Sequence, residues 1–416
     1  MTPEAVSVVI VSRGRPALLR RCLVGLDQQD HPEFEIVVVA DADGVAAVER
    51  MGWAGRVKVI RFEEANISAA RNKGISAAAA SVIAFIDDDA IAEHDWLRRL
   101  TAPITERRAD AAGGFVFGRN GLSFQWTARE VFSDATAREI KVDPSEETIL
   151  TGSAGRGIKT EGTNMAFRRS LLIELGGFDV GYAYYLDETD LNMRLAEEGT
   201  KTAIVPRAQV HHGFAMSDRR QADRAPRDLA LVGASLARFV RRHRGGLDPE
   251  PVRRSEREKY RAALLGHMVA GRILPTAVEP VLRSFDQGWA RSAALEGPQP
   301  EFSENPTFAR FTPRIGAGAE HEVIWGWLGS LGQLRRRARK AVANGHRATV
   351  YAFSLTSLYH HRHFDPEGYW EQRGGLFGRS LRTDPIFKYW KRAERVKREE
   401  RLGGQNSGFK RTKTTI

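Results

Sequence analysis

The run Ser81-Val-Ile-Ala-Phe-Ile86, followed by Asp87-Asp88-Asp89, decides the fold of this chain. An unbroken apolar run of this length predicts a strand buried on both faces, as in a parallel sheet covered by helices. The three acids then lie at the carboxyl end of the strand, where open α/β sheets bind their ligands. Carboxylate oxygens are hard ligands for a divalent cation, and such a cation suits a diphosphate. Capping of a helix expected to begin near Ala90 would explain one or two acids, but not three.

The same pattern of apolar strands and helices precedes this run. Strands are predicted at residues 6–11, 34–40 and 57–62, and helices at residues 16–26 and 68–80. The order β-α-β-β-α-β predicts an α/β fold with a mostly parallel central sheet. Residues 1–100 are therefore expected to form a nucleotide-binding half.

Length and composition indicate more than one domain. The chain has 416 residues, of which 42% are hydrophobic, enough for a substantial core. Residues 101–217 are expected to complete the first domain as its second functional half, with a mobile loop over residues 133–157. A helical extension is predicted over residues 218–300 and a basic C-terminal region of unknown role over 301–416. Together they are expected to be largely helical.

Charge and cysteine content bear on partners and location. The net charge of +11, from 63 Lys and Arg against 52 Asp and Glu, favours anionic partners. Cys22 is the only cysteine, so no intramolecular disulfide is possible. The N-terminus lacks a signal-peptide pattern, and no apolar run approaches the roughly 20 residues that span a bilayer. We expect a cytoplasmic protein. A basic helix at residues 385–401 can lie on the inner face of an anionic membrane, bind an acidic partner or form a solvated edge of the domain, and the last is the commonest use of such a helix. No nucleic acid is expected, because no binding motif accompanies the charge.

Seven short segments, taken in order, resemble the family 2 glycosyltransferases, inverting enzymes of the GT-A fold. These segments are residues 6–11, 69–74, 85–89, 162–167, 176–179, 187–194 and 210–212. Each motif is weak alone, but their order and spacing are specific. The resemblance implies a GT-A type nucleotide-sugar-binding fold. It also implies transfer of a sugar from a nucleotide diphosphate donor to a glycan or lipid-linked acceptor, as in cell-surface polysaccharide biosynthesis.

The resemblance further implies a metal site. Asp87 and Asp89 match the family's Asp-x-Asp motif, whose carboxylates contact the donor ribose and hold Mg²⁺ or Mn²⁺ on the diphosphate. His212 matches the family's downstream histidine and is the expected third metal ligand, ahead of His211. Asp88 points to the opposite face if the strand persists, so it is the weaker ligand and is expected to line the donor site.

The segment Asp187-Glu188-Thr189-Asp190 occupies the place of the family's acidic catalytic motif. Glu188 falls on the position of the base, which takes the proton of the acceptor hydroxyl. Asp187 is the alternative, because this chain has Asp-Glu where the family often has Glu-Asp. The alternative is that the cluster is a solvated helix start, in which Asp190 is charge in the first turn balanced by Arg194.

Further residues are expected to line the donor pocket. Arg71 and Asn72 match the family's Ala-Arg-Asn motif, and Arg71 would steady the diphosphate, although both also suit an ordinary helix surface. Asp41 follows the second strand, where an acid can meet the base or ribose. The remaining candidates are polar residues after the first strand and near residue 164: Ser12, Arg13, Arg15 and Asn164.

Two other classes of protein remain open. A nucleotidyltransferase acting on sugar phosphates also combines a parallel sheet with metal-binding acids. It usually has a Gly-rich, Lys-containing loop after the first strand, of which residues 12–16 are a poor version. A non-catalytic nucleotide-sugar or glycan-binding protein would bind the donor without transferring it.

Overall fold

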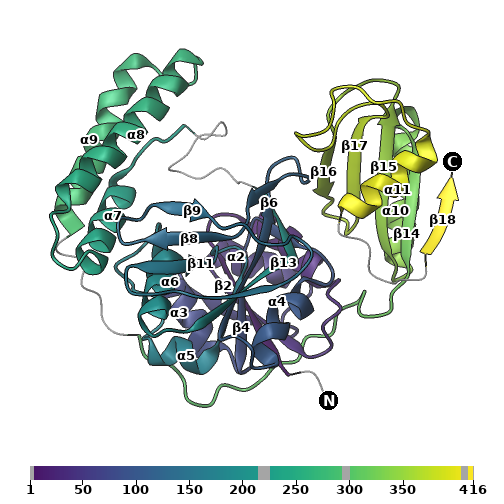
Figure 1. Cartoon of the computed structure of the whole chain (residues 1–416). Helices are drawn as coiled ribbons and strands as arrows, with labels where there is room; N and C mark the ends of the chain where they lie inside the picture. Colours follow the sequence, from purple (N-terminus) through teal and green to yellow (C-terminus); the bar gives the residue numbers. More distant parts are fainter. Residues whose placement is uncertain (1–3, 214–224, 293–299, 404–410, 416) are drawn as a thin grey trace.

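The computed structural model describes residues 4–213, 225–292, 300–403 and 411–415. An N-terminal α/β domain is followed by a helical segment and by a smaller sheet unit with its own helices (Figure 1). No helix within these ranges combines the length and the apolar character needed to cross a membrane.

The main sheet has ten strands, eight of them in the order β10-β13-β6-β12-β4-β1-β2-β3, with β5 and β7 attached to β13 and β6. Its parallel part consists of β1 (Val6–Ser12), β2 (Phe34–Ala40), β3 (Lys58–Arg61) and β4 (Val82–Asp87). The register places Val11 opposite Asp87, and Ser12 opposite Ala40. The carboxyl ends of these strands therefore meet at one edge, and the apolar run delivers the acids there, as predicted.

Helices cover both faces of this parallel part. They are α1 (Pro16–Leu26), α2 (Ala42–Arg50), α3 (Ile67–Ala77), α4 (Trp96–Thr105), α5 (Arg169–Glu174) and α6 (Asp187–Glu197). Val8 and Ile10 of β1 pack in one buried cluster with residues of α1, α2 and α4. Val9 packs in another cluster with residues of α3, α5 and α6. Since successive strand residues face opposite sides, both faces are buried, which explains the unbroken apolar runs.

The other part of the main sheet is mixed. It contains β5 (Ala90–Ala92), β6 (Ala111–Phe117), β7 (Phe124–Trp126), β10 (Thr148–Thr151), β12 (Met165–Arg168) and β13 (Lys201–His212). β12 runs antiparallel between β4 and β6, and β5 pairs with the end of β13, with His212 opposite Ala90. The helix expected near Ala90 therefore begins only at Trp96, because residues 90–92 form a strand with β13.

The predicted mobile loop over residues 133–157 contains strands instead. β8 (Arg129–Phe132), β9 (Ala137–Glu139) and β11 (Arg156–Lys159) form a three-stranded sheet, and β10 joins the main sheet. These strands are short and polar, so their pairing depends on partners that are distant in the sequence. Helix α2 was not predicted either.

Helices follow β13, as expected. They are α7 (Ala230–His243), α8 (Glu250–Val269) and α9 (Val278–Arg291), with a short 3-10 turn at Pro275–Ala277. Residues 218–224 and 293–299 of the predicted helical extension lie outside the described residues. Further along, Phe311 returns to the N-terminal domain, where its backbone N donates to Phe34 O at 2.7 Å and its ring packs on Trp53.

From His321 onward the chain contains strands as well as the expected helices. The chain forms a five-stranded sheet from β14 (His321–Trp327), β15 (Arg347–Ser354), β16 (His361–Phe364), β17 (Trp370–Gly375) and β18 (Arg411–Thr415). The 3-10 turn Leu328–Ser330 and helices α10 (Leu331–Ala343) and α11 (Arg392–Leu402) complete it. Val350 packs toward α10, whereas Tyr351 packs toward Val396 of α11, so β15 is buried on both faces. The helix predicted over residues 385–401 begins only at Arg392.

Gly74 of α3 sets the distance between that helix and β1. A Cβ atom at this position would lie 2.4 Å from Val9 Cγ1. We therefore expect Gly74→Ala to push α3 away from the sheet and to lower the free energy of unfolding by about 1–3 kcal/mol in chemical denaturation. Gly266→Ala in α8 is the matched control, since nothing lies within 4 Å of its Cβ position. If both variants lost the same stability, the clash with Val9 would not be the cause.

Candidate functional site

Two acidic segments that are distant in the sequence meet through Arg71 at the carboxyl edge of the main sheet. Arg71 Nη2 lies 3.3 Å from Asp87 Oδ1, and Nη1 contacts Asp187 Oδ2. Nη2 also donates to Gly162 O at 3.2 Å. The arginine is only 3% exposed. A buried guanidinium thus joins the end of β4 to the start of α6.

Asp87, Asp89 and His212 form a group that could hold a metal ion. One ligand atom of each residue lies within 4.8 Å of those of the other two, and His212 Nε2 is 3.3 Å from Asp89 Oδ1. The pairing of β5 with β13 produces this arrangement, because it places His212 opposite Ala90, next to Asp89. Two carboxylates and an imidazole suit Mn²⁺, and the carboxylates also suit Mg²⁺. The donor set fits the divalent cation expected from the sequence.

Asp88 contacts the last residue of β1 and the loop that follows it. Ser12 Oγ donates to Asp88 Oδ2 at 2.7 Å, and Arg15 Nη1 donates to Asp88 Oδ1 at 3.3 Å. Burial raises the pKa of Asp88 to about 7, although Arg15 opposes the shift. Arg15 also lies 3.9 Å from Asp89 Oδ2, whereas Arg13 is exposed. Of the two arginines in this loop, Arg15 is the one that reaches the acids.

The second acidic segment begins α6. Leu186, which precedes it, has a φ of 66°, a left-handed conformation that is uncommon for a residue other than glycine and that recurs at functional sites. Burial raises the pKa of Asp187, although Arg71 opposes the shift. Burial would also raise the pKa of Glu188. Lys159 overcomes this effect, because its Nζ donates to Glu188 Oε1 at 2.9 Å and holds the pKa below its ordinary value.

Asp190 has a structural partner on each side. Its Oδ2 accepts from Arg194 Nε at 2.8 Å, and its Oδ1 lies 3.0 Å from His243 Nε2 of α7. The pair of Asp190 with Arg194 is the helix charge pair that the sequence offered as an alternative. Asp190 links α6 to α7.

The side-chain amides of two predicted donor-site residues, Asn72 and Asn164, form hydrogen bonds within the protein. Asn72 Nδ2 donates to Phe178 O at 2.7 Å, and Asn72 Oδ1 accepts from Phe178 N at 2.8 Å. Asn164 is fully buried, with Nδ2 donating to Ala208 O at 2.8 Å and Oδ1 accepting from Trp96 Nε1 at 2.8 Å. Because a buried amide must find hydrogen-bond partners, these contacts give both residues a structural role. The structure does not bring their amides to the acids.

Asp41 also has a local role. Its Oδ1 accepts from Gly44 N at 3.0 Å as the N-cap of α2, and its Oδ2 accepts from Gly14 N at 2.7 Å. The residue therefore starts α2 and holds the loop after β1, in which Gly14 has a φ of 66°. Its carboxylate remains partly exposed beside that loop.

His211 faces the C-terminal sheet. Its Nε2 lies 2.9 Å from Glu93 Oε1, and Arg362 Nη2 of β16 lies 3.0 Å from the same oxygen. The ring of Trp370 stands 4.3 Å from that of His211. Burial would raise the pKa of Glu93, but Arg362 and His211 lower it to about 2. Glu93 thus connects the N-terminal domain to the C-terminal sheet.

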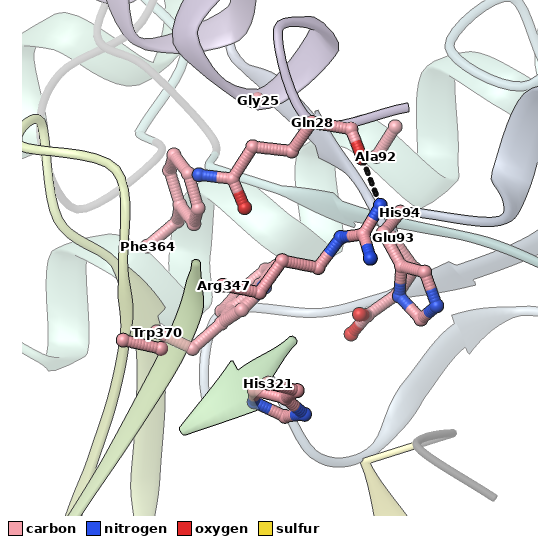
Figure 2. Close-up of a pocket in the computed structure, with 10 residues that line it drawn as sticks. Gly25, Gln28, Ala92, Glu93, His94, His321, Arg347, Phe364 and Trp370 are labelled. Atoms are coloured by element: carbon pink, nitrogen blue, oxygen red, sulfur yellow. Dashed lines mark hydrogen bonds between the residues drawn. The ribbon is translucent and has the colours of Figure 1, made fainter. Parts of the chain in front are cut away.

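A pocket lies between these two units (Figure 2). Glu93 and His94 line it from the N-terminal domain, with His321 and Trp370 from the C-terminal sheet. Arg347 crosses this boundary and donates to a backbone oxygen, that of Gln28, at 3.1 Å. The C-terminal sheet therefore packs against His211, the residue that precedes His212 in β13.

Sequence reasoning missed Lys159 and Glu93. Lys159 ends β11, within a region whose strands have no clear local pattern. Glu93 gave a weak signal, as an acid that directly follows the apolar residues 90–92. Both depend on partners far away in the sequence.

The fold and site define a GT-A type glycosyltransferase domain, because a mostly parallel sheet gathers an Asp-x-Asp segment, a histidine and an acidic helix start at one edge. Residues 7–176 match the family described as "Glycosyl transferase family 2". The N-terminal domain belongs to that family.

Several curated proteins are similar to this chain. "Putative glycosyltransferase EpsH" of Bacillus subtilis is 31% identical over 176 residues, covering 41% of this chain and 49% of the relative. "Glucosyl-dolichyl phosphate glucuronosyltransferase" of Haloferax volcanii is 30% identical over 166 residues, covering 36% and 48%. "Pre-mycofactocin glycosyltransferase" of Mycobacterium tuberculosis is 27% identical over 246 residues, covering 57% and 48%. The chain spans about half the length of these relatives.

The contact of Glu93 with Arg362 should stabilise the fold in a pH-dependent way. The folded-state pKa of about 2 lies below the ordinary 4.5, so the contribution is present above about pH 4.5 and is lost as the pH falls toward 2. Arg362→Met should lower the stability by about 3 kcal/mol at pH 7, because it leaves Glu93 buried without its arginine. Without Arg362, burial should raise the pKa of Glu93, so Glu93 of the variant takes up a proton as the pH falls and the stability gap to the parent should narrow. Thermal unfolding between pH 7 and 4 measures this gap.

Arg310→Met is the control for that experiment, since Arg310 forms an exposed pair with Glu33 at 3.2 Å. Its loss should cost no more than about 1 kcal/mol. A gap for Arg362→Met that stayed constant with pH would contradict the role given to Glu93.

Proposed function

We propose that this protein is a metal-dependent inverting glycosyltransferase. It moves a sugar from a nucleotide diphosphate donor to a glycan or lipid-linked acceptor in cell-surface polysaccharide biosynthesis. The observation that carries the proposal is the meeting of the Asp87, Asp89 and His212 group with Asp187 and Glu188. The family of the N-terminal domain supports the reaction class. The name of the Haloferax volcanii relative indicates a lipid-linked substrate for that protein, which supports the lipid-linked alternative here.

Asp87, Asp89 and His212, which we call the metal group, would bind the donor through a divalent cation. Asp89 and His212 would hold Mg²⁺ or Mn²⁺, while Asp87, whose side chain is one-third exposed, would contribute to the metal site and the donor ribose. A cation held by these residues would supply positive charge that stabilises the leaving diphosphate. Arg15 adds positive charge beside Asp88 and Asp89.

Glu188 is the proposed base. Its side chain is 17% exposed, whereas that of Asp187 is 3% exposed and pairs with Arg71, so Glu188 is the more accessible to an acceptor hydroxyl. Its lowered pKa keeps it ionised at neutral pH, as a proton acceptor must be. The acceptor oxygen gives its proton to Glu188 and bonds to the anomeric carbon. The bond from that carbon to the diphosphate oxygen breaks on the opposite face, so the configuration inverts.

For Arg71 we propose a role other than steadying the diphosphate. Its guanidinium contacts Asp87, Asp187 and Gly162 O. Binding the diphosphate would require at least one of these buried contacts to open. We therefore assign Arg71 as the residue that positions the two acids.

Two substitutions separate metal binding from catalysis. Asp89→Asn should weaken the binding of Mn²⁺ and of the donor about tenfold or more, because it removes a charged ligand. Glu188→Gln preserves size and hydrogen bonding, so donor binding should stay near normal while kcat falls about 10²-fold to 10⁴-fold. Calorimetry measures binding, and release of nucleoside diphosphate measures transfer. Parental turnover in the Gln variant would refute the assigned base.

The same assay separates the other two classes. A nucleotidyltransferase would release pyrophosphate, and a non-catalytic binder would retain the donor without releasing either product. Release of nucleoside diphosphate that depends on both a divalent cation and an acceptor is the result expected here.

Lys159 should set the pH dependence of the reaction. Lys159→Met removes the ammonium that lowers the pKa of Glu188, so that pKa should rise. The acidic limb of the kcat/KM profile should then move to higher pH, since the base is protonated over a wider range. Lys73→Met, on the exposed side of α3, is the control and should leave the profile in place. An unmoved limb in Lys159→Met would mean that Glu188 does not titrate in catalysis.

A further inference from the structure

The C-terminal sheet unit carries an exposed apolar surface outside the candidate active site. Twelve large hydrophobic side chains are exposed in the described part of the chain, and six of them lie within residues 355–359 and 386–389. We call these six the loop patch: Leu355, Leu358, Tyr359, Ile386, Phe387 and Tyr389. Leu355, Ile386 and Tyr389 are 71%, 70% and 72% exposed. Such a concentration of exposed apolar side chains marks an interaction surface.

The two segments of the loop patch lie side by side. They follow β15 and β17, which are parallel neighbours and so end at the same edge, the end toward which the β18 arrow points in Figure 1. Phe377 connects the segments. Its N donates to Thr356 O at 3.2 Å, and its O accepts from Lys388 N at 3.0 Å. Its ring lies 5.4 Å from that of Phe387 and 5.7 Å from that of Tyr389.

Basic residues surround the loop patch. Residues 376–392 contain five cationic residues, Arg379, Arg382, Lys388, Lys391 and Arg392, and a single acid, Asp384. Arg398 pairs with Asp384 at 2.5 Å and neutralises it. The guanidinium of Arg379 lies 4.0 Å from the centre of the Tyr359 ring. Positive charge and apolar surface therefore occupy the same edge of the sheet.

We propose that the loop patch docks this protein on an anionic lipid membrane. Apolar side chains flanked by cations match the membrane interface, where aliphatic and aromatic groups enter the acyl boundary and Lys and Arg attract anionic headgroups. Leu355, Leu358 and Ile386 are aliphatic, which favours hydrocarbon over stacking on a sugar ring. The docking element is a pair of loops, because the aromatic residues before Arg392 lie outside α11.

Vesicle sedimentation with the full chain tests this proposal. The protein should bind phosphatidylcholine vesicles that contain phosphatidylglycerol, but not pure phosphatidylcholine, and added salt should weaken the binding. The double variant Ile386→Ser/Phe387→Ser should lower the partition coefficient about tenfold or more, and Lys388→Gln/Lys391→Gln should also lower it. All four side chains are exposed, so these changes should leave thermal unfolding near that of the parent.

A matched control and three outcomes decide the question. Val269→Ser/Leu274→Ser changes residues that are 83% and 71% exposed at the end of α8 and just beyond it, and it should leave binding unchanged. Absence of vesicle binding, equal binding to neutral vesicles, or an equal loss in the control would overturn the proposal. Without vesicle binding, a dimer that the patch variant dissociates in light scattering would identify a second copy as the occupant. Transfer to a water-soluble acceptor should be the same in the patch variants, so this test is independent of the proposed function.

Discussion

The buried contact of Arg71 with Asp87 and Asp187 is the constraint on which the candidate site depends. A guanidinium removed from water needs carboxylates beside it, and the carboxylates likewise need the guanidinium. Arg71 comes from α3, Asp87 from the end of β4 and Asp187 from the start of α6. The position of α3 follows in turn from the close approach of Gly74 to Val9. The geometry of the site is therefore a consequence of helix packing against the sheet.

The end of β13 imposes a second constraint. Successive residues of a strand face opposite sides, so His211 and His212 cannot serve the same group. His212 approaches Asp89, while His211 approaches Glu93 and the ring of Trp370. One residue pair thus places the metal group and the contact with the C-terminal sheet on adjacent positions of a single strand. The contact of His211 with the C-terminal sheet is therefore one residue away from the metal group.

The sequence predicted those parts of the fold in which the residues of a strand alone indicate that the strand is buried. β1, β2 and β4 are unbroken apolar runs, and the acids after β4 follow from the rule that ligands bind at the carboxyl ends of parallel strands. β8, β9 and β11 carry no such signal, since they are short, polar and stabilised by each other. The amides of Asn72 and Asn164 show the same limit, because residue type does not reveal which distant backbone group a buried amide will meet.

This chain has Asp187-Glu188 where the family often has Glu-Asp, and the lengths of the two side chains explain this order. The shorter Asp187 stays against Arg71, whereas the longer Glu188 extends to Lys159 on β11 and keeps part of its surface exposed. Neighbours of this kind drive the pKa values of adjacent carboxyls apart, upward for Asp187 through burial and downward for Glu188 through the ammonium. Adjacent acids with opposite environments are suited to different tasks, as proposed here for Asp187 and Glu188. The structural one suits the buried Asp187, and the proton-accepting one suits the ionised, accessible Glu188.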